Sequence, residues 1–246
     1  MAKSRARNPE VFYDGSKLVD ADSTALSGIY TTYATVAAMN AAAPAANTIA
    51  LLLPSAFTGT GKPTVSIPVI YNGTVWEPFG GSQVIFKVML GTLAVPTVVL
   101  GAVGRFPLAV DPIIPGGLLA TNGDTLEIQA RSQKHGVAGT GTIRLWLGTD
   151  TTYTNNSFLT SFSITAVDLQ HTTMTTEVIR TSATTLFSSG NAVANGNSGA
   201  SVFADKSTLI NFAENQTITV AMNALTAADT YDLLELEVVW KMGTLA

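Results

Sequence analysis

The chain has 246 residues, of which 46% are hydrophobic, 12% are charged and none is cysteine. The high apolar content excludes intrinsic disorder, and the absence of cysteine excludes disulfide scaffolds, cysteine-ligated metals and thiol chemistry. A formal net charge of −4 argues against nucleic-acid binding, which needs dense lysine and arginine to neutralise phosphates. Because charged residues reach only half of their usual share of ~25%, the composition favours a protein that assembles with others.

The first 81 residues are predicted to form an N-terminal arm or a small β-containing attachment region. A short helix is expected over Thr35–Ala46, where alanine is abundant, and strands are expected over Thr48–Pro54 and Thr64–Trp76. Inside the second strand segment, Asn72-Gly73 predicts a two-residue hairpin turn, because both residues tolerate a positive φ.

The uncharged run Val88–Gly104 approaches the length of a membrane span. It contains Gly91, Pro96 and Gly101, so two strands joined by a turn are the better prediction. The basic N-terminus is followed by polar and acidic residues instead of an apolar segment. We therefore expect neither a transmembrane span nor a signal peptide.

From residue 82 to residue 246 the sequence predicts a succession of short strands separated by turns. The expected strands are Val84–Leu90, Leu126–Arg131, Ile143–Leu147, Phe158–Leu169, Thr173–Thr185, Thr208–Phe212, Gln216–Asn223 and Asp232–Lys241. The stretch Ser188–Ser201 is rich in glycine, asparagine, serine and alanine and is expected to be a long loop.

Alternation of apolar and polar residues predicts which side chains share a face of each strand. In the first strand one face is expected to hold Val84, Phe86, Val88 and Leu90, and in the last strand Leu234, Leu236, Val238 and Trp240. Such strands, with no amphipathic helix between them, predict an all-β protein, namely an antiparallel β-sandwich of the jelly-roll type over residues 82–246. An immunoglobulin-like sandwich is the alternative, although the chain lacks the Cys–Trp–Cys pattern of that fold.

The order of these strands resembles a known family. The segments that carry the resemblance are Gly123–Leu126, Gly141–Leu145 and the turn Ala227–Asp232 before the final strand. Over about residues 85–246 they are similar to the trimeric jelly-roll domains of tailed-phage virion proteins, which are shaped like tumour-necrosis-factor folds. The resemblance implies a capsid decoration (cement) protein, a head fibre or a tail component, and it carries over no functional residue.

Patterns typical of catalysis or metal binding are scarce. His135 and His171 are interpreted as solvated loop residues, because no G-x-S-x-G or H-E-x-x-H motif accompanies them. Gly59–Lys62 resembles part of a phosphate loop, but Pro63 follows the lysine where serine or threonine is needed, so a loop or hairpin is preferred. Asp20–Thr24 could offer oxygens to Ca²⁺, yet it lacks the glycine and glutamate of an EF-hand loop, so capping is preferred. We expect no catalytic residue, no cofactor and no metal.

Glu235 and Glu237 are two residues apart and therefore share a face of the last strand. Paired carboxylates across a cleft are the catalytic groups of glycosidases. On an outward sheet face the same spacing keeps a surface soluble, and this is the interpretation that we prefer here.

Five aromatic residues could form a sugar-binding platform: Trp76, Trp146, Trp240, Tyr153 and Phe158. Trp146 falls on the outward face of its strand if Ile143, Leu145 and Leu147 face the core. An outward tryptophan either stacks on a sugar or packs in an oligomer interface, and the low charge of the chain favours the interface. Trp240 shares its face with aliphatic residues and is expected in the core.

Together these features predict a non-enzymatic virion protein. The leading hypothesis is a capsid decoration protein that forms a homotrimer and binds the major capsid protein or other virion proteins, without nucleic acid or membrane partners. The alternative is a receptor-binding or carbohydrate-binding module of a tail or fibre. The N-terminal region, with Lys3, Arg5 and Arg7, is expected to dock onto an acidic capsid surface, unless it simply packs on the base of the sandwich.

Overall fold

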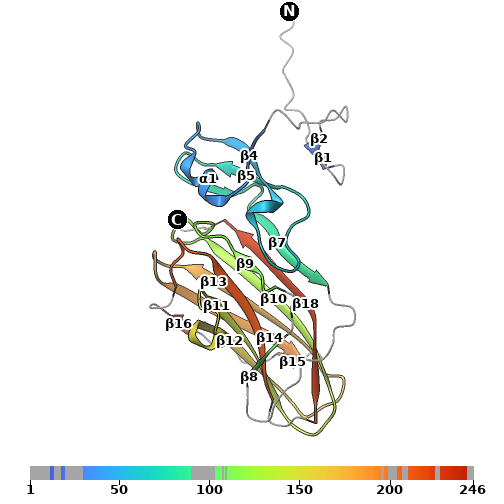
Figure 1. Cartoon of the computed structure of the whole chain (residues 1–246). Coiled ribbons are helices and arrows are strands. Elements are labelled where there is room, and N and C mark those ends of the chain that lie inside the picture. Colours follow the sequence, from blue (N-terminus) through green and yellow to red (C-terminus); the bar gives the residue numbers. More distant parts are fainter. Residues whose placement is uncertain are drawn as a thin grey trace, which may run out of the picture.

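The structure, a computed structural model, describes residues 12–13, 18–19, 30–89, 103–106, 108, 110–194, 197–198, 204–206, 210–224 and 228–242. Its larger part is a sandwich of two antiparallel sheets (Figure 1). The strands of the first sheet are β7 (Ser82–Met89), β10 (Thr125–His135), β13 (His171–Arg180), β14 (Leu186–Ala194), β15 (Asn197–Ser198), β16 (Ala204–Lys206) and β18 (Thr230–Lys241). Their order is β15-β14-β13-β10-β18-β7, and β16 also pairs with β14.

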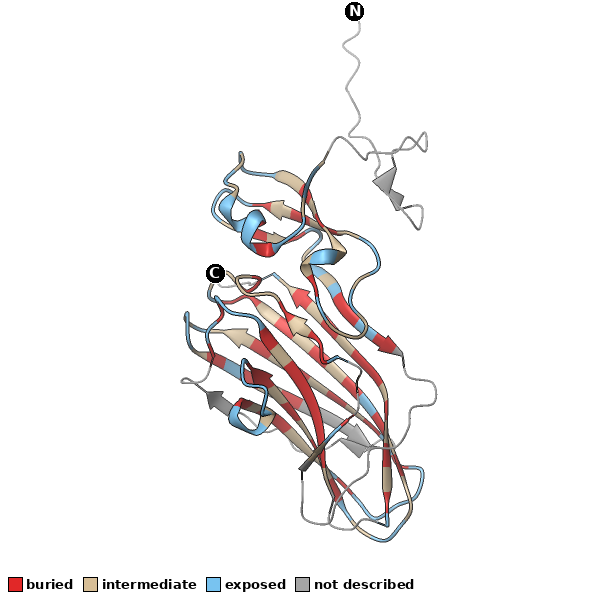
Figure 2. Cartoon of the chain, in the orientation of Figure 1, coloured by how far each residue is buried: buried red, intermediate tan, exposed pale blue. Residues whose placement is uncertain are grey.

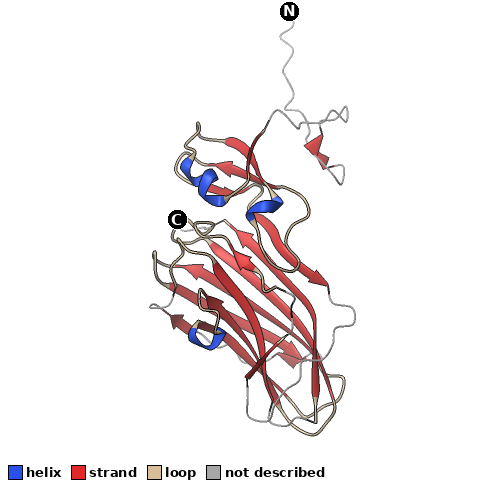
Figure 3. Cartoon of the chain, viewed as in Figure 1, coloured by secondary structure: helices blue, strands red, loops and turns tan. Residues whose placement is uncertain are grey.

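The second sheet lies across the core from the first. Its strands are β8 (Val103–Arg105), β9 (Ile113–Ile114), β11 (Gly141–Gly148), β12 (Ser157–Ile164) and β17 (Gln216–Ala224). Their order is β12-β11-β17-β8, and β9 also pairs with β17. A single 3₁₀ turn, η2 (Tyr153–Asn155), lies between β11 and β12. Strands dominate the described part of the chain (Figure 3), so the predicted all-β sandwich is confirmed.

Buried residues alternate with less buried ones along strands of both sheets (Figure 2), because successive side chains of a strand point to opposite faces. One hydrophobic core contains, among others, Leu126, Ile128 and Ala130 of β10 and Ile143, Leu145 and Leu147 of β11. Full burial of a leucine or isoleucine side chain is worth about 1.5–3 kcal/mol, so this alternation is the main source of stability.

The pairing order of the sandwich is nested. The first strand, β7, pairs with the last, β18, while β8 pairs with β17, β10 with β13, and β11 with β12. A jelly roll has this nested connectivity. The assignment of the sandwich as a jelly roll stays a prediction, because β14, β15 and β16 add strands to the first sheet that are not part of the nested pairs.

Residues 30–81 form a second, smaller sheet with the order β3-β4-β5-β6. Its elements are β3 (Thr31–Tyr33), α1 (Val36–Ala41), β4 (Thr48–Leu52), the 3₁₀ turn η1 (Pro54–Ala56), β5 (Ile67–Tyr71) and β6 (Trp76–Pro78). The short strands β1 (Phe12–Tyr13) and β2 (Leu18–Val19) pair with each other further upstream. A helix is present where one was predicted, but it covers only Val36–Ala41 of the expected Thr35–Ala46. It begins where the Thr35 hydroxyl accepts a hydrogen bond from the Ala38 N–H at 3.1 Å.

The small sheet packs against one end of the sandwich (Figure 1). The Asn40 side chain donates to the Gly117 carbonyl at 2.9 Å, Thr58 forms a bridge with Ile113, and the buried residues of both parts make one core cluster. The packing predicted as the alternative for the N-terminal region therefore holds for residues 30–81. The domain boundary at residues 81/82 stays a prediction, although β7 does begin at Ser82.

Three expectations about side-chain faces or turns were wrong. A bulge in β7 leaves Ile85 without a partner, so Ile85 and Phe86 are both buried while Val84 is 47% exposed. A second bulge, at Leu234 in β18, removes that residue from the face of Leu236. The predicted hairpin between β5 and β6 exists, but its loop spans four residues, 72–75, and is organised by the Asn72 side chain.

The stretch predicted as a loop at Ser188–Ser201 is instead largely strand. Residues 186–194 form β14, which pairs with β13 from Arg180↔Leu186 to Thr172↔Ala194. A Cβ at Gly190 would lie 2.4 Å from the Thr160 hydroxyl oxygen of β12, so glycine lets the two sheets approach closely here. The segment Thr208–Phe212, predicted as a strand, contains no strand among its described residues.

A fully buried ion pair closes the end of the sandwich away from the small sheet. Lys134 is 0% exposed and Asp229 is 1% exposed, and the ammonium lies 3.0 Å from the carboxylate. The carboxylate also accepts hydrogen bonds from the backbone N–H groups of Ala138 (2.9 Å) and Gly139 (2.8 Å). Burial acts to raise the pKa of Asp229, but these N–H groups and the Lys134 ammonium outweigh it and hold that pKa below its usual value.

Replacing Lys134 by methionine is expected to lower the free energy of unfolding by about 3–5 kcal/mol, because it leaves a buried carboxylate without its counter-ion. Urea denaturation followed by fluorescence measures this loss. The control is Lys87→Met, which removes the ammonium of a side chain that is 49% exposed. This variant should lose far less unfolding free energy. Equal losses in the two variants would contradict the proposed importance of the buried pair.

A low pH should reduce the difference in unfolding free energy between the wild type and Lys134→Met. A carboxyl whose pKa is lower in the folded chain stabilises the fold above its unfolded pKa of about 3.9, and the contribution disappears as the pH falls through the folded pKa. Below about pH 4 the gap in unfolding free energy between the wild type and Lys134→Met should therefore narrow, since a protonated Asp229 no longer needs a counter-ion. A gap that is unchanged between neutral and acidic pH would show that Asp229 does not carry the effect.

Candidate functional site

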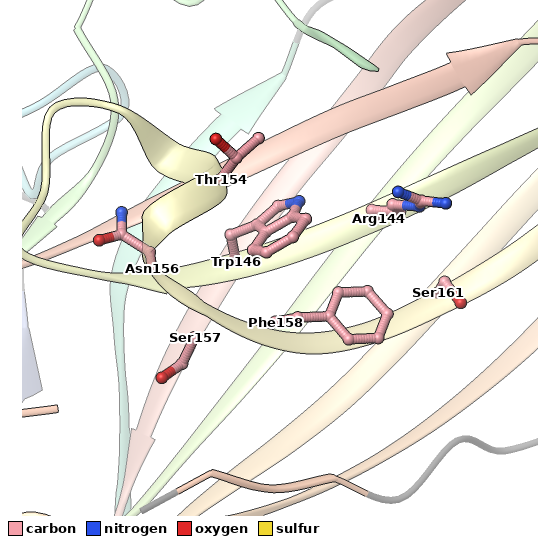
Figure 4. Close-up of a pocket in the computed structure, with 7 residues that line it drawn as sticks. All are labelled: Arg144, Trp146, Thr154, Asn156, Ser157, Phe158 and Ser161. Atoms are coloured by element: carbon pink, nitrogen blue, oxygen red, sulfur yellow. The ribbon is translucent and has the colours of Figure 1, made fainter. Parts of the chain in front are cut away.

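The candidate site is an open groove on the outer face of the second sheet, which we call the aromatic groove. It has a volume of about 560 Å³ and is lined by Arg144, Trp146, Thr154, Asn156, Ser157, Phe158 and Ser161 (Figure 4). The lining side chains come from β11, β12 and the loop with η2 that joins them.

A bulge in β12 creates the aromatic part of the groove. Leu145 pairs with Thr160, but the next residue, Trp146, pairs with Phe158, so Leu159 has no partner of its own. In a regular ladder Phe158 would stand one position further along, opposite Leu147, and would point toward the core. The extra residue instead brings Phe158 to the outer face beside Trp146.

Two aromatic rings, those of Trp146 and Phe158, line the groove, and the Tyr153 ring packs against Trp146. The centroids of Trp146 and Phe158 are 5.2 Å apart, and those of Trp146 and Tyr153 are 5.9 Å apart with an interplanar angle of 70°. Of the five aromatic residues considered for a sugar platform, the structure therefore brings together Trp146, Tyr153 and Phe158. It places the other two in the core, since Trp76 is 3% exposed and Trp240 is 1% exposed.

The loop that carries Tyr153 is held rigidly by Asp150 and Asn156. The Asp150 N–H donates to the Asn156 side-chain oxygen at 2.8 Å, and the Asn156 amide donates back to the Asp150 carbonyl at 3.1 Å. The Thr152 N–H and then the Asn155 amide donate to the Asp150 carboxylate and lower its pKa. Gly148 permits this arrangement, because a Cβ there would lie 2.4 Å from the Asn156 side-chain oxygen.

A polar row runs beside the aromatic rings. Arg144 pairs with Ser161 on one side and with Ala221 of β17 on the other, and Ala221 pairs with Arg105 of β8. Since directly paired residues point to the same face, both arginines lie on the outer face of this sheet. Arg105 forms an ion pair with Asp111 at 2.6 Å.

The two arginines of this row act on the pKa of Tyr153. Burial raises the pKa of Tyr153, while Arg105 and Arg144 act in the opposite direction because both are cationic. Among the described residues the groove lining includes one arginine and no carboxylate. The aromatic groove is therefore a surface with apolar rings, a cation and hydroxyl or amide groups.

The other polar candidates lie elsewhere. His135 ends β10 rather than lying in a loop, and its Nε2 is 2.7 Å from the Asp232 carboxylate. Glu235 and Glu237 share a face as predicted, and both contact the Lys87 ammonium, at 3.3 Å and 2.5 Å. They are thus partners in a surface ion-pair network, although Glu235 is only 6% exposed.

Gly59–Lys62 is a loop, as predicted, that contacts β7 through a hydrogen bond from the Lys87 N–H to the Gly61 carbonyl at 2.8 Å. Lys3, Arg5, Arg7 and the Asp20–Thr24 cluster lie outside the described residues. Within the part of the chain that is described, no three His, Asp or Glu side chains gather in a way that could hold a metal ion. In the same part, none of the helices has the length and apolar character needed to cross a membrane.

The sequence offered Trp146, Tyr153 and Phe158 among five candidate aromatic residues, but it did not show that these three gather at one groove. The outward position of Phe158 depends on a bulge, which cannot be seen in the alternation of one strand. The signal for Arg144 was visible, since it alternates with the same core residues as Trp146 and so had to share its face. The prediction that Trp146 lies in an oligomer interface stays a prediction.

No protein-family model and no curated protein matches the chain. Among solved structures, the CBM2 module of the evolved Dit of Lactobacillus casei BL23 phage J-1 matches with a TM-score of 0.31 and 8% identity, over 65% of this chain and 96% of that one. Alginate lyase Aly36B matches with a TM-score of 0.24 and 9% identity, over 66% of this chain and 97% of that one. Likenesses this remote assign no function.

Replacing Gly148 by alanine is expected to push Asn156 out of place and to lower the free energy of unfolding by about 1–3 kcal/mol, as overpacking does. The control is Thr151→Ala, an exposed position in the same loop, which should stay within about 0.5 kcal/mol of the wild type. Urea denaturation compares the two. If both variants unfold like the wild type, Asn156 does not hold the loop rigidly.

Proposed function

We propose that this chain is a non-enzymatic structural protein of a virion, and that its sandwich carries a saccharide-recognition surface in the aromatic groove. The observation that carries the proposal is the side-by-side placement of Trp146 and Phe158 on the outer face of the sheet, with polar side chains next to them. Support for a virion role comes from the strand order that resembles trimeric jelly-roll domains, which agrees with the nested pairing of the sandwich.

The lining of the groove suits a sugar ring for a chemical reason. A pyranose presents C–H groups on its faces and hydroxyl groups around its rim, so it needs an aromatic surface beside hydrogen-bonding groups. Trp146 and Phe158 supply the first, while Thr154 and Ser161 supply the second. The groove is built on two paired strands and a rigid loop, which reduces the conformational cost of binding.

Trp146→Ala is expected to weaken saccharide binding about tenfold, because it removes the ring on which the sugar would stack. A glycan array identifies ligands of the wild type, and isothermal titration then compares variants. Phe79→Ala is the matched control, since Phe79 is 42% exposed and lies outside the groove. Wild-type protein that binds no glycan, or a Phe79 variant that loses binding equally, would refute the proposal.

A second candidate is the role of a capsid decoration protein that forms a homotrimer and binds the major capsid protein or other virion proteins. The observation in its favour is that Trp146 is only half-buried in a single copy of a chain with 12% charged residues. Charged residues are depleted where protein interfaces are fully buried. In this role a neighbouring copy covers the aromatic groove, and Lys3, Arg5 and Arg7 contact the capsid.

If the groove is the trimer interface, Trp146→Glu should convert the protein to a monomer, because it would place a carboxylate in the desolvated centre of the contact. Light scattering at micromolar concentration measures the mass. Phe79→Glu provides the control and should leave the trimer intact. A wild type that is monomeric at this concentration excludes the second candidate, and a trimer that survives Trp146→Glu places the interface elsewhere.

A further inference from the structure

The charged side chain in the polar half of the aromatic groove suits a ligand that offers hydrogen-bond acceptors. The groove's single charged side chain is Arg144, whose guanidinium can only donate hydrogen bonds. The described lining contains neither aspartate nor glutamate, even though acidic residues outnumber basic ones in the whole chain by 17 to 13. The groove is therefore cationic on a protein whose net charge is negative.

A second donor lies beside the first. The Trp146 indole nitrogen is buried, and it has no hydrogen-bond acceptor among the described residues. In Figure 4 this nitrogen lies on the edge of the ring that is turned toward the Arg144 guanidinium. An indole N–H donates only, and a buried polar group without a partner is uncommon in folded proteins.

The paired strands fix the distance between the stacking surface and the cation. Trp146 and Arg144 are two residues apart on β11 and point to the same face, so they are separated by about 7 Å along the strand. A pyranose ring that stacks on Trp146 can therefore direct one exocyclic substituent toward Arg144. Ser161, the partner of Arg144 on β12, borders the same position.

A second arginine lies near the groove. Arg105 lies in the same row of paired residues as Arg144, with Ala221 between them. The Arg105 side chain is 45% exposed, and the Asp111 carboxylate compensates its charge. Of these two arginines, Arg144 is the one that lines the groove beside the aromatic rings.

We propose that the aromatic groove binds an acidic saccharide, whose ring stacks on Trp146 and Phe158 and whose carboxylate accepts hydrogen bonds from Arg144 and from the Trp146 indole N–H. This inference rests on the proposed saccharide-binding function and specifies its ligand class. A carboxylate is an acceptor-only group, so it complements two donor-only groups. Because the indole nitrogen is covered in the free chain, a lining side chain must turn aside when the ligand enters.

The test measures the binding of oligogalacturonate, oligomannuronate and oligoglucuronate, each beside its methyl ester, by isothermal titration. Esterification removes the charge and keeps the ring, so the affinity ratio of acid to ester isolates the role of the carboxylate. The wild type is expected to prefer at least one acid by about tenfold, which is the worth of a hydrogen bond between charged groups. Added salt should reduce this preference.

The variants assign the preference to Arg144. Arg144→Gln should abolish the preference for the acid over the ester, Arg144→Lys should restore part of it, and Lys62→Gln should leave it unchanged because Lys62 lies outside the groove. Trp146→Ala should weaken binding of both acid and ester because it removes the stacking surface, and it should weaken the acid more because it also removes the indole N–H. Circular dichroism of each variant checks that the sandwich is intact.

Failure of this inference and failure of the proposed function give different results. If neutral glycans or the esters bind as tightly as the acids, and Trp146→Ala removes that binding, the acidic ligand class is wrong while saccharide recognition stands. If an acid is preferred but Arg144→Gln keeps the preference, the assignment to this groove is wrong. If no saccharide binds, the inference and the proposed function are both overturned.

Discussion

The antiparallel ladders of the sandwich are interrupted where one residue of a strand has no partner opposite it. Ile85 in β7, Leu159 in β12 and Leu234 in β18 occupy these positions. Each extra residue reverses the faces of all the side chains that follow it along the strand. The bulge at Leu159 turns Phe158 toward Trp146, so the aromatic groove exists only because the ladder is irregular there.

A buried ion pair stabilises the end of the sandwich away from the small sheet. The Lys134–Asp229 pair is fully buried and joins the end of β10 to the segment before β18, and two backbone N–H groups complete the shell of the carboxylate. A buried pair of this kind adds little net stability compared with apolar residues of the same size, but it is costly to break. Its geometry therefore fixes how the loop after β10 meets the final strand.

The groove combines features that usually occur apart on a protein surface. Its aromatic rings favour an apolar partner, whereas Arg144 and the Trp146 indole N–H favour an acceptor-rich one. A saccharide and a neighbouring subunit can each satisfy both demands in a groove of about 560 Å³. The rigid loop behind the groove, held by Asp150 and Asn156, keeps Tyr153 against Trp146 before any partner binds.

The sequence by itself determined the all-β class, the presence of a short helix after Thr35 and the inward face of β11, because helix propensity and alternation are local properties of a few neighbouring residues. The tertiary structure decided which residues form bulges, since a bulge depends on the partner strand as well as on its own sequence. It also decided that residues 186–194, most of which fall in the stretch expected to be a loop, form a strand, because β14 pairs with β13 over its whole length and Gly190 lets it approach Thr160 closely. The grouping of Trp146, Tyr153 and Phe158 follows from the same pairing of strands, which no single segment of the sequence specifies.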